Sequence, residues 1–397
     1  MKQHTIIAMG VLLLALSGCA NQSSQADDGD TSPDSVGSDS GPREPVPPLP
    51  SDSDSGSKQK VDANGIPVFD DCPVVQAKDA CADGWCRIEP GTFLYGTPEE
   101  AGVPCSTGYN EWPPVQVTLT RPFLMQQYEV TQAQWEAMGF PNPARDVHPD
   151  KPITWINWFE ALAYCNALSE KEGLDTCYDL SGCQGEVGTG CPTGSWFYDN
   201  GCVEKHDNHD EFVPGLYFAF GEVHKYPRRY DCPGYRLPTG SEWQYAARAC
   251  TSAATYNGDI SPELRIGGCE QEPVLDPIAW HCGNADALQV VKTRKPNLWH
   301  LYDMLGNAME WTDQQNVGLW LEYDEGTSGP LTDPIGHSET APDGVFFKAP
   351  AGGSFLMGTC LNRPAYLFQD IALGRSSSVG FRPVRTILPP ASPKKGK

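Results

Sequence analysis

Cysteine content limits the fold of this chain more than any other feature. The 397 residues include 15 cysteines, and one of them, Cys19, ends an apolar leader, so 15 − 1 = 14 remain for bridges in the mature protein. A high, even count is typical of extracytoplasmic proteins, where disulfides form and persist. We therefore expect a disulfide-rich domain with most thiols oxidised. Cys360 stands alone near the C-terminus and is expected to reach back to the group between Cys165 and Cys282.

Residues 1–18 predict a lipoprotein signal peptide. A basic start and an apolar run at 6–16, too short to span a membrane, lead to "LSGC", which ends at Cys19. This ending resembles the bacterial lipobox, in which the cysteine is lipidated and becomes the mature N-terminus. The alternative is an ordinary signal peptide with a chance cysteine. We expect a lipid on Cys19 to hold the protein at the cell envelope, facing the periplasm or the cell surface, and Ala20 favours the outer membrane by analogy with enteric bacteria.

Residues 19–66 combine the expected lipidated cysteine with an acidic tether. The segment is rich in Ser, Asp, Gly and Pro, so it cannot bury enough apolar surface to offset its chain entropy. An acidic interaction tail is the alternative. The whole chain has 28 basic and 51 acidic side chains, 28 − 51 = −23, and no basic cluster stands out in the aromatic-rich part. We therefore expect no nucleic-acid partner, because binding a phosphate backbone needs clustered Lys and Arg.

A single domain is expected at residues 67–385, with a flexible tail at 386–397. Short alternating runs such as "FLYG" and "VQVTLT" predict strands interrupted by Gly and Pro, and helices are few. Capping residues predict helices after Thr131, Asn157 and Thr239. The coarse class is therefore α+β with much irregular structure.

A Gly- and Cys-rich insert occupies residues 175–233, between the second and third predicted helices. It has little apolar material of its own, so we expect disulfides to order it. Cys202, His206 and His209 within it have a spacing that could suit zinc, but an acidic, solvated loop is the plainer interpretation.

Several motifs follow one another in a fixed order along the domain. They are "YEVTQAQW" (128–135), "PITWINWFEALAYCNAL" (152–168), "YRLPTGSEWQYAARA" (235–249), "LYDMLGNAMEW" (301–311), "GGSF" (352–355) and "GFRPVR" (380–385). This order resembles the formylglycine-generating enzyme family, also called the sulfatase-modifying-factor domain family. The resemblance implies one compact domain related to the C-type lectin fold and poor in regular secondary structure, which agrees with the α+β class.

The resemblance also implies a calcium site. By likeness to the family's site in "LYDMLGNAMEW", Asp303 and Glu310 would supply carboxylates, and Gly306 and Ala308 would supply backbone carbonyls. The alternative is a carboxylate that binds turn amides without metal. Asn284 matches the first ligand of a second family site, but the connection that follows is too short for the others, so that site is not predicted.

The residues at the positions of the family's copper ligands argue against a copper cofactor. In enzymes of the family, two cysteines after Gly-Gly-Ser-Trp hold copper(I), and the gapless alignment from Gly352 places Met357 and Asn362 at their positions. An Asn amide has negligible affinity for this soft ion. A rival pair, Met357 with Cys360, is weaker because a thioether is neutral, and a disulfide for Cys360 is the plainer account. The family bridge from the position of Cys165 also fails, because proline replaces its partner, so Cys165 is expected to find a new one.

These observations predict a non-catalytic envelope lipoprotein that binds a peptide or a polymer. The first alternative is a copper-dependent oxidase that converts a substrate cysteine to formylglycine, or a related modification that uses oxygen. The second alternative is a structural protein of the envelope.

Overall fold

The structure is a computed structural model that describes residues 81–97, 111, 114–183, 185–188, 196–198, 201–206, 209–213, 223–314, 330–335 and 347–389. All of them belong to the compact unit Lys58–Lys397. The predicted signal peptide, Cys19 and most of the tether lie in the other unit, Met1–Ser57, outside the described residues. Among the described residues, no helix has the length and apolarity needed to cross a membrane.

The largest sheet joins strands from both ends of the described chain. It is antiparallel, with the order β1-β2-β5-β15-β9. Its strands are β1 (Cys81–Ala82), β2 (Trp85–Ile88), β5 (Phe123–Gln126), β15 (Val384–Thr386) and β9 (Tyr235–Arg236). Because β15 pairs with β5 on one side and β9 on the other, the end of the domain lies between its beginning and its middle.

A second sheet has the order β11-β4-β3 and contains the predicted alternating runs. Strand β3 (Gly91–Tyr95) is antiparallel to β4 (Val115–Leu119), and β11 (Leu331–Thr332) is parallel to β4. In β4 the apolar side chains Val115, Val117 and Leu119 are buried and the intervening polar ones are not. Alternate side chains of β4 therefore face the core, and the prediction of a strand from the alternating run "VQVTLT" is confirmed.

The remaining strands are short. Parallel β10 (Met309–Glu310) and β14 (Val379–Gly380) form one pair, and antiparallel β12 (Phe347–Lys348) and β13 (Asp370–Ile371) form another. The insert contributes an antiparallel sheet of β6 (Trp196–Tyr198), β7 (Gly201–His206) and β8 (His209–Val213). The three residues weighed as zinc ligands fall in β7 and β8, where His206 is opposite His209, and their side chains are outside the described set.

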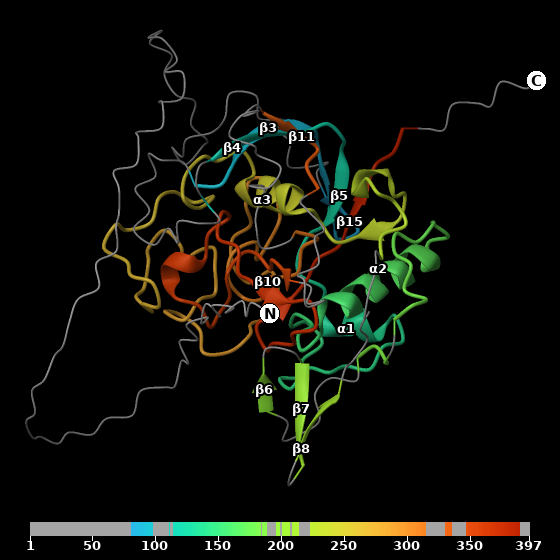
Figure 1. The fold of residues 1–397 in the computed structure, drawn as a ribbon. Helices are drawn as coiled ribbons and strands as arrows, with labels where there is room; N and C mark the ends of the chain where they lie inside the picture. The colour runs from blue at the N-terminus through green and yellow to red at the C-terminus, as the bar shows by residue number, and fades with distance from the viewer. Residues whose placement is uncertain are drawn as a thin grey trace, which may run out of the picture. The chain divides into compact units, whose positions relative to one another are not determined.

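Each of the three α-helices in the described ranges begins at a predicted cap. Thr131, Asn157 and Thr239 start α1 (Gln132–Glu136), α2 (Trp158–Lys171) and α3 (Gly240–Arg248), and all three have a complete capping box. Figure 1 shows α3 beneath β3 and β4, which it contacts, and α2 contacts β9. The described residues also include two short 3-10 turns, η2 (Arg229–Asp231) and η3 (Thr359–Leu361).

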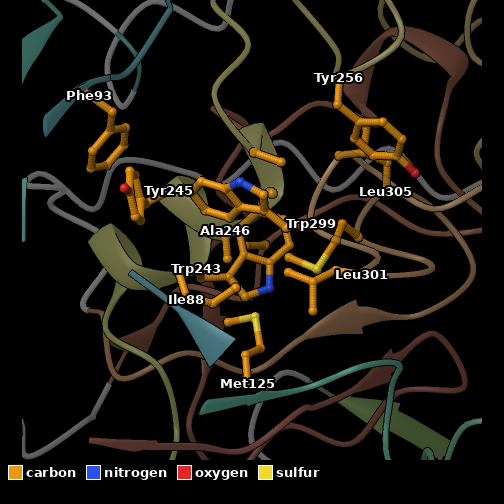
Figure 2. Close-up of a cluster of buried hydrophobic side chains, with 14 of the residues drawn as sticks. Ile88, Phe93, Met125, Trp243, Tyr245, Ala246, Tyr256, Trp299, Leu301 and Leu305 are labelled. Atoms are coloured by element: carbon orange, nitrogen blue, oxygen red, sulfur yellow. The ribbon is translucent and has the colours of Figure 1, made fainter. Parts of the chain in front are cut away.

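The core consists mainly of two large clusters of buried side chains. In the first, Trp243 and Tyr245 of α3 pack with Trp299 and Phe93 (Figure 2). The second cluster surrounds α1 and α2. This mixed α/β architecture with few helices and open sheets confirms the predicted fold class.

Disulfides confirm part of the cysteine analysis and correct part of it. Three pairs join described residues: Cys81–Cys86, Cys177–Cys232 and Cys269–Cys282. The second closes both ends of the insert, as expected for a segment without a core of its own. Cys250 and Cys360 are also disulfide-bonded.

Two cysteines depart from the expectation of oxidised thiols. Cys165 and Cys183 are free, and Cys165 has found no new partner. Cys165 lies on the buried side of α2 among apolar side chains, where a thiol packs as a small hydrophobic group. Packing therefore accounts for a cysteine that the sequence suggested would be bridged.

Candidate functional site

Two glycines form a turn at the start of the segment predicted to correspond to the family's copper loop. Gly352 and Gly353 both have left-handed backbones, with φ of 94° and 73°. A Cβ on Gly352 would lie 2.8 Å from the Met304 carbonyl oxygen, and one on Gly353 would lie 2.4 Å from Asn362 Oδ1. Only glycine fits this turn, because both the backbone conformation and the space exclude a side chain.

Asn362 is fully buried at the position of the second copper ligand. Its Nδ2 donates to the Gly358 carbonyl oxygen at 3.0 Å, which ties the residue across η3. Its Oδ1 and the Oγ of buried Ser354 accept no hydrogen bond from the described residues. The amide therefore closes a turn, and Asn362 Oδ1 and Ser354 Oγ are two buried polar atoms at the predicted copper position.

Met357 and Cys360 do not form a soft pair of ligands in this structure. Met357 is half-buried and packs between two apolar clusters, while its carbonyl oxygen accepts from Cys282 N at 3.3 Å. Cys360 is buried and its sulfur is in a disulfide, so it offers no thiolate. A disulfide for Cys360 was the plainer of the two predictions, and it is confirmed.

Arg363, which follows this loop, is bound to a carboxylate that the sequence analysis did not single out. Its guanidinium makes two bonds to Glu111, at 2.6 and 2.9 Å, and its Nε donates to the Cys360 carbonyl oxygen at 2.7 Å. Thr97 Oγ1 also donates to Glu111, at 2.5 Å. These groups are all buried, so the arginine fixes the loop to the rest of the core.

The predicted calcium residues lie in a buried cluster of carboxyl groups. Glu310 accepts from Arg382 through both oxygens, at 2.6 and 2.7 Å, and from Trp243 Nε1 at 2.7 Å. Asp303 accepts from the backbone N of Lys292 at 2.7 Å through Oδ2, and its Oδ1 has no partner among the described residues. Glu129 completes the cluster.

Glu129 accepts from Ala308 N at 3.0 Å and from Asn307 Nδ2 at 3.1 Å. Burial, and then the charges of Asp303 and Glu310, raise its pKa well above the usual range. Burial likewise raises the pKa of Asp303 to about 6. The cluster therefore has three carboxyl groups and one arginine in an ion pair with them, Arg382. Because negative charges outnumber positive ones, the cluster favours binding of either a proton or a metal cation.

The cluster fits calcium in part. Asp303 provides a buried carboxylate oxygen without a partner, which is the kind of ligand that calcium takes. Both oxygens of Glu310 already accept hydrogen bonds from Arg382 or Trp243. A calcium ion would therefore have to share an oxygen of Glu310 with one of these donors. In the described ranges, no group of three or more His, Cys, Asp or Glu side chains is arranged to hold a metal ion. Calcium therefore stays a prediction.

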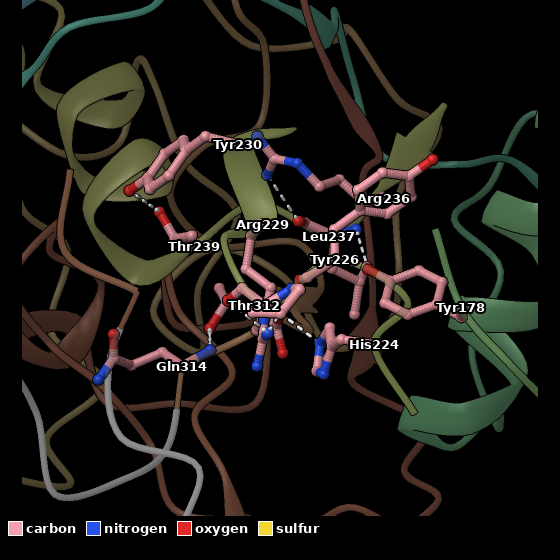
Figure 3. A network of polar contacts seen from close by, with 12 residues as sticks. Tyr178, His224, Tyr226, Arg229, Tyr230, Arg236, Leu237, Thr239, Thr312 and Gln314 are labelled. Atoms are coloured by element: carbon pink, nitrogen blue, oxygen red, sulfur yellow. Dashed lines mark hydrogen bonds and ion pairs between the residues drawn. The ribbon is translucent and has the colours of Figure 1, made fainter. Parts of the chain in front are cut away.

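A second buried carboxylate, Asp313, has three basic side chains as partners. Arg229 Nε, His224 Nε2 and Lys348 Nζ lie 3.0, 2.7 and 3.1 Å from its oxygens, and Figure 3 shows the network around the first two. Burial alone would raise the pKa of Asp313, but its partners His224, Lys348 and Arg229 hold it well below its usual range. Lys348 also lies 4.1 Å from the centre of the Trp158 ring. The network joins α2, η2 and β12.

The sequence analysis did not single out Glu129, Arg382 or Asp313. Each lies in or directly beside a recognised motif, where a charged residue among large apolar ones predicts a buried ion pair. Motif position was thus the available signal, but the identity of each partner required the fold.

Comparisons with known proteins agree with this architecture. Residues 73–387 match the Sulfatase-modifying factor enzyme 1-like domain. A Paenibacillus barcinonensis protein named "Chaperone protein LppX" is 30% identical over 199 residues, which cover 48% of this chain and 61% of that protein. The formylglycine-generating enzyme of Streptomyces coelicolor is 24% identical over 292 residues, 72% of this chain and 82% of the enzyme. The chain thus spans less than two thirds of the Paenibacillus relative.

Solved structures show the same fold. Treponema denticola variable protein 1 has a TM-score of 0.51 and 24% identity, with 75% of this chain and 93% of that chain covered. PvdO from Pseudomonas aeruginosa has a TM-score of 0.50 and 16% identity, with 81% of this chain and all of that chain covered. At these identities the likeness concerns the fold alone. The match over residues 73–387 is sufficient to place the chain in the Sulfatase-modifying factor enzyme 1-like family, which includes formylglycine-generating enzymes.

Proposed function

We propose that the chain is a non-catalytic binding module of the bacterial cell envelope, anchored by a lipid on Cys19, and that its ligand is a polypeptide. The observation that carries the proposal is the pair of residues at the copper positions. Asn362 is buried in a turn, and Met357 contributes a neutral thioether. Neither side chain supplies the thiolate that copper(I) needs.

A polypeptide is the preferred ligand for two reasons. The related Paenibacillus protein is named a chaperone, and a chaperone acts on polypeptides. The enzymes that share the domain also take a cysteine-containing peptide as substrate. Loss of the metal ligands removes the chemistry and leaves the rest of the domain intact, so a polypeptide-binding role is the function that the retained fold supports best.

Incubation with copper(I), oxygen and a peptide that contains Cys-x-Pro-x-Arg tests the catalytic part of the proposal. Mass analysis should find no conversion of the peptide cysteine to an aldehyde. The Streptomyces coelicolor enzyme serves as the positive control. The double variant Met357→Cys/Asn362→Cys places cysteines at both predicted copper positions. Its activity shows whether the residues at those two positions alone prevent turnover. Turnover by the natural chain would overturn the proposal in favour of the oxidase.

Binding and anchoring are tested separately. Lipidation predicts that the first residue recovered by mass spectrometry is Cys19 with acyl groups attached, and an unmodified N-terminus beyond Cys19 contradicts it. A crosslinking experiment on isolated envelopes distinguishes a binding module from a structural protein. A binding module should give crosslinks to polypeptides that a soluble competitor peptide reduces, whereas a structural protein should give crosslinks that no peptide affects.

A further inference from the structure

A small surface made of cations and aromatic rings lies over the buried carboxyl cluster. It consists of Lys292, Arg294, Trp280, Tyr128 and Tyr302, and we refer to it as the cation–aromatic surface. Lys292 is exposed, and the other four are half-buried. The sequence around the two cations is "KTRK", basic at three of four positions in a chain whose net charge is −23.

Aromatic rings hold both cations. Arg294 Cζ lies 3.5 Å from the centre of the Trp280 ring. Lys292 Nζ lies 5.0 Å from the centre of the Tyr128 ring and 5.6 Å from that of Tyr302. Contacts of this length are within the range of cation–π attraction, which orients a cation without cancelling its charge.

Hydrogen bonds tie the rings to neighbouring parts of the chain. Trp280 Nε1 donates to Thr293 Oγ1 at 2.9 Å, so the Trp280 ring is tied to the residue between Lys292 and Arg294. Tyr302 N donates to the Gln127 carbonyl oxygen at 2.9 Å, which places Tyr302 beside Tyr128. The surface is therefore assembled from four short stretches of the chain: one for each ring and one for the two cations.

Lys292 has an uncommon backbone conformation. Its φ is 64°, in the left-handed region that disfavours side chains with a Cβ. The backbone N of this residue donates to the buried Asp303 carboxylate, and this bond holds the strained residue in place while the side chain remains exposed. Strain that the surrounding structure maintains is typical of residues with a functional role.

Among the described residues, no carboxylate forms an ion pair with Lys292 or Arg294. Asp276 and Asp303 act on Arg294 electrostatically, but Asp276 binds His281 at 2.8 Å and Asn284 at 3.1 Å. The two cations are thus presented without being neutralised, unlike the buried cations of the cores. A partner with negative charge would gain their attraction without first breaking an ion pair.

We propose that the cation–aromatic surface binds an acidic segment of a polypeptide partner. Trp, Tyr and Arg are the residue types most enriched among those that dominate protein–protein binding energy, and this surface has all three together with an unpaired lysine. Carboxylates of the partner would contact Lys292 and Arg294, and its apolar side chains would pack on the exposed parts of the three rings. The inference rests on the proposed function, because it names the chemistry of a polypeptide ligand.

A labelled peptide of ten residues, rich in Asp and Glu, tests this surface by fluorescence anisotropy. The intact chain should bind it, and affinity should fall as salt is raised, because the attraction is electrostatic. The double variant Lys292→Gln/Arg294→Gln should weaken binding about tenfold or more. Lys295→Gln is the matched control: it removes an exposed cation of the same segment for which the structure records no aromatic contact, and it should weaken binding much less.

Three results would overturn the inference. One is absence of binding by the intact chain, and another is an equal loss in the double variant and in Lys295→Gln. The third is tighter, variant-sensitive binding of polygalacturonate or of single-stranded DNA, which would assign the surface to a different polymer. Aldehyde formation in the copper assay would overturn the proposed function and leave this result intact, so the two failures can be distinguished.

Discussion

Glu310 and Arg382 form a two-point ion pair in the interior of the domain, with N–O distances of 2.6 and 2.7 Å. Both side chains are almost completely removed from solvent. The pair joins the motif that contains β10 to the segment after β14, and it also neutralises one of the three carboxyl groups of the buried cluster. Arg382 is therefore the residue on which the charge balance of this region depends.

Replacing Arg382 should destabilise the domain severely. Arg382→Met leaves Glu310 buried without its counter-ion, and breaking a buried pair in this way costs about 3–5 kcal/mol of the free energy of unfolding. Arg87 and Glu89 offer a matched control, because their pair is exposed, and Arg87→Met should cost less than about 1 kcal/mol. Denaturant unfolding at pH 7 measures both. A smaller loss for Arg382→Met than for Arg87→Met would contradict this account.

Stability should depend on pH through the carboxyl cluster. Burial raises the pKa of Asp303 to about 6, whereas in the unfolded chain it titrates near the usual value, about 4. Between these values the native state binds more protons than the unfolded state, so the free energy of unfolding decreases as pH rises. Glu129, whose pKa is also raised, extends the effect in the same direction.

Asp303→Asn isolates the contribution of Asp303. The stability of the natural chain relative to this variant should fall between about pH 4 and pH 6, because the variant has lost the titrating group. Urea titrations at several pH values give both free energies. A stability difference that does not change with pH would show that Asp303 titrates normally in the folded protein.

Calcium should raise the melting temperature of the folded chain. The ion would meet an unpartnered oxygen of Asp303 and reduce the repulsion among the three carboxylates, and binding to the native state alone stabilises it by mass action. Chelator should lower the melting temperature of the purified protein, and calcium should restore it. In Asp303→Asn the response should disappear, while magnesium, which demands a tighter octahedral site, should act weakly in either protein. If neither chelator nor added calcium changes the melting temperature of the natural chain, then calcium does not bind at this site.

Local signals predicted the helices and strands well. The three capping residues and the alternation in β4 are properties of a few consecutive residues, so they could be interpreted without the fold. The assignment of Met357 and Asn362 to the copper positions rests on the motif register between Gly352 and Arg363, and it stays a prediction. Burial of Asn362 and the disulfide at Cys360 agree with that register.

Long-range electrostatics could not be predicted in the same way. Glu111 and Arg363 are 252 residues apart in the sequence, and Asp303 meets Glu129 only through the fold. The cation–aromatic surface was missed for a similar reason: its two cations are close in sequence, but three segments supply the rings that hold them. The short run "KTRK" by itself does not indicate which rings contact its cations.

Cys165 and Cys183 should differ in reactivity, although both are free. Cys165 is buried, and burial raises the pKa of its thiol far above the usual range, so it should react with a thiol reagent only after unfolding. Cys183 is half-buried, and burial raises its pKa to about 11, so it should react slowly in the folded protein and faster as pH rises. Cys183→Ser should remove one thiol from the count of the native, unreduced protein. Cys165→Ser should leave the native count unchanged and remove one thiol from the count after denaturation. If Cys165→Ser lowers the native count, or if neither substitution changes the denatured count, then the buried thiol is accessible or bridged and the account of its packing is wrong.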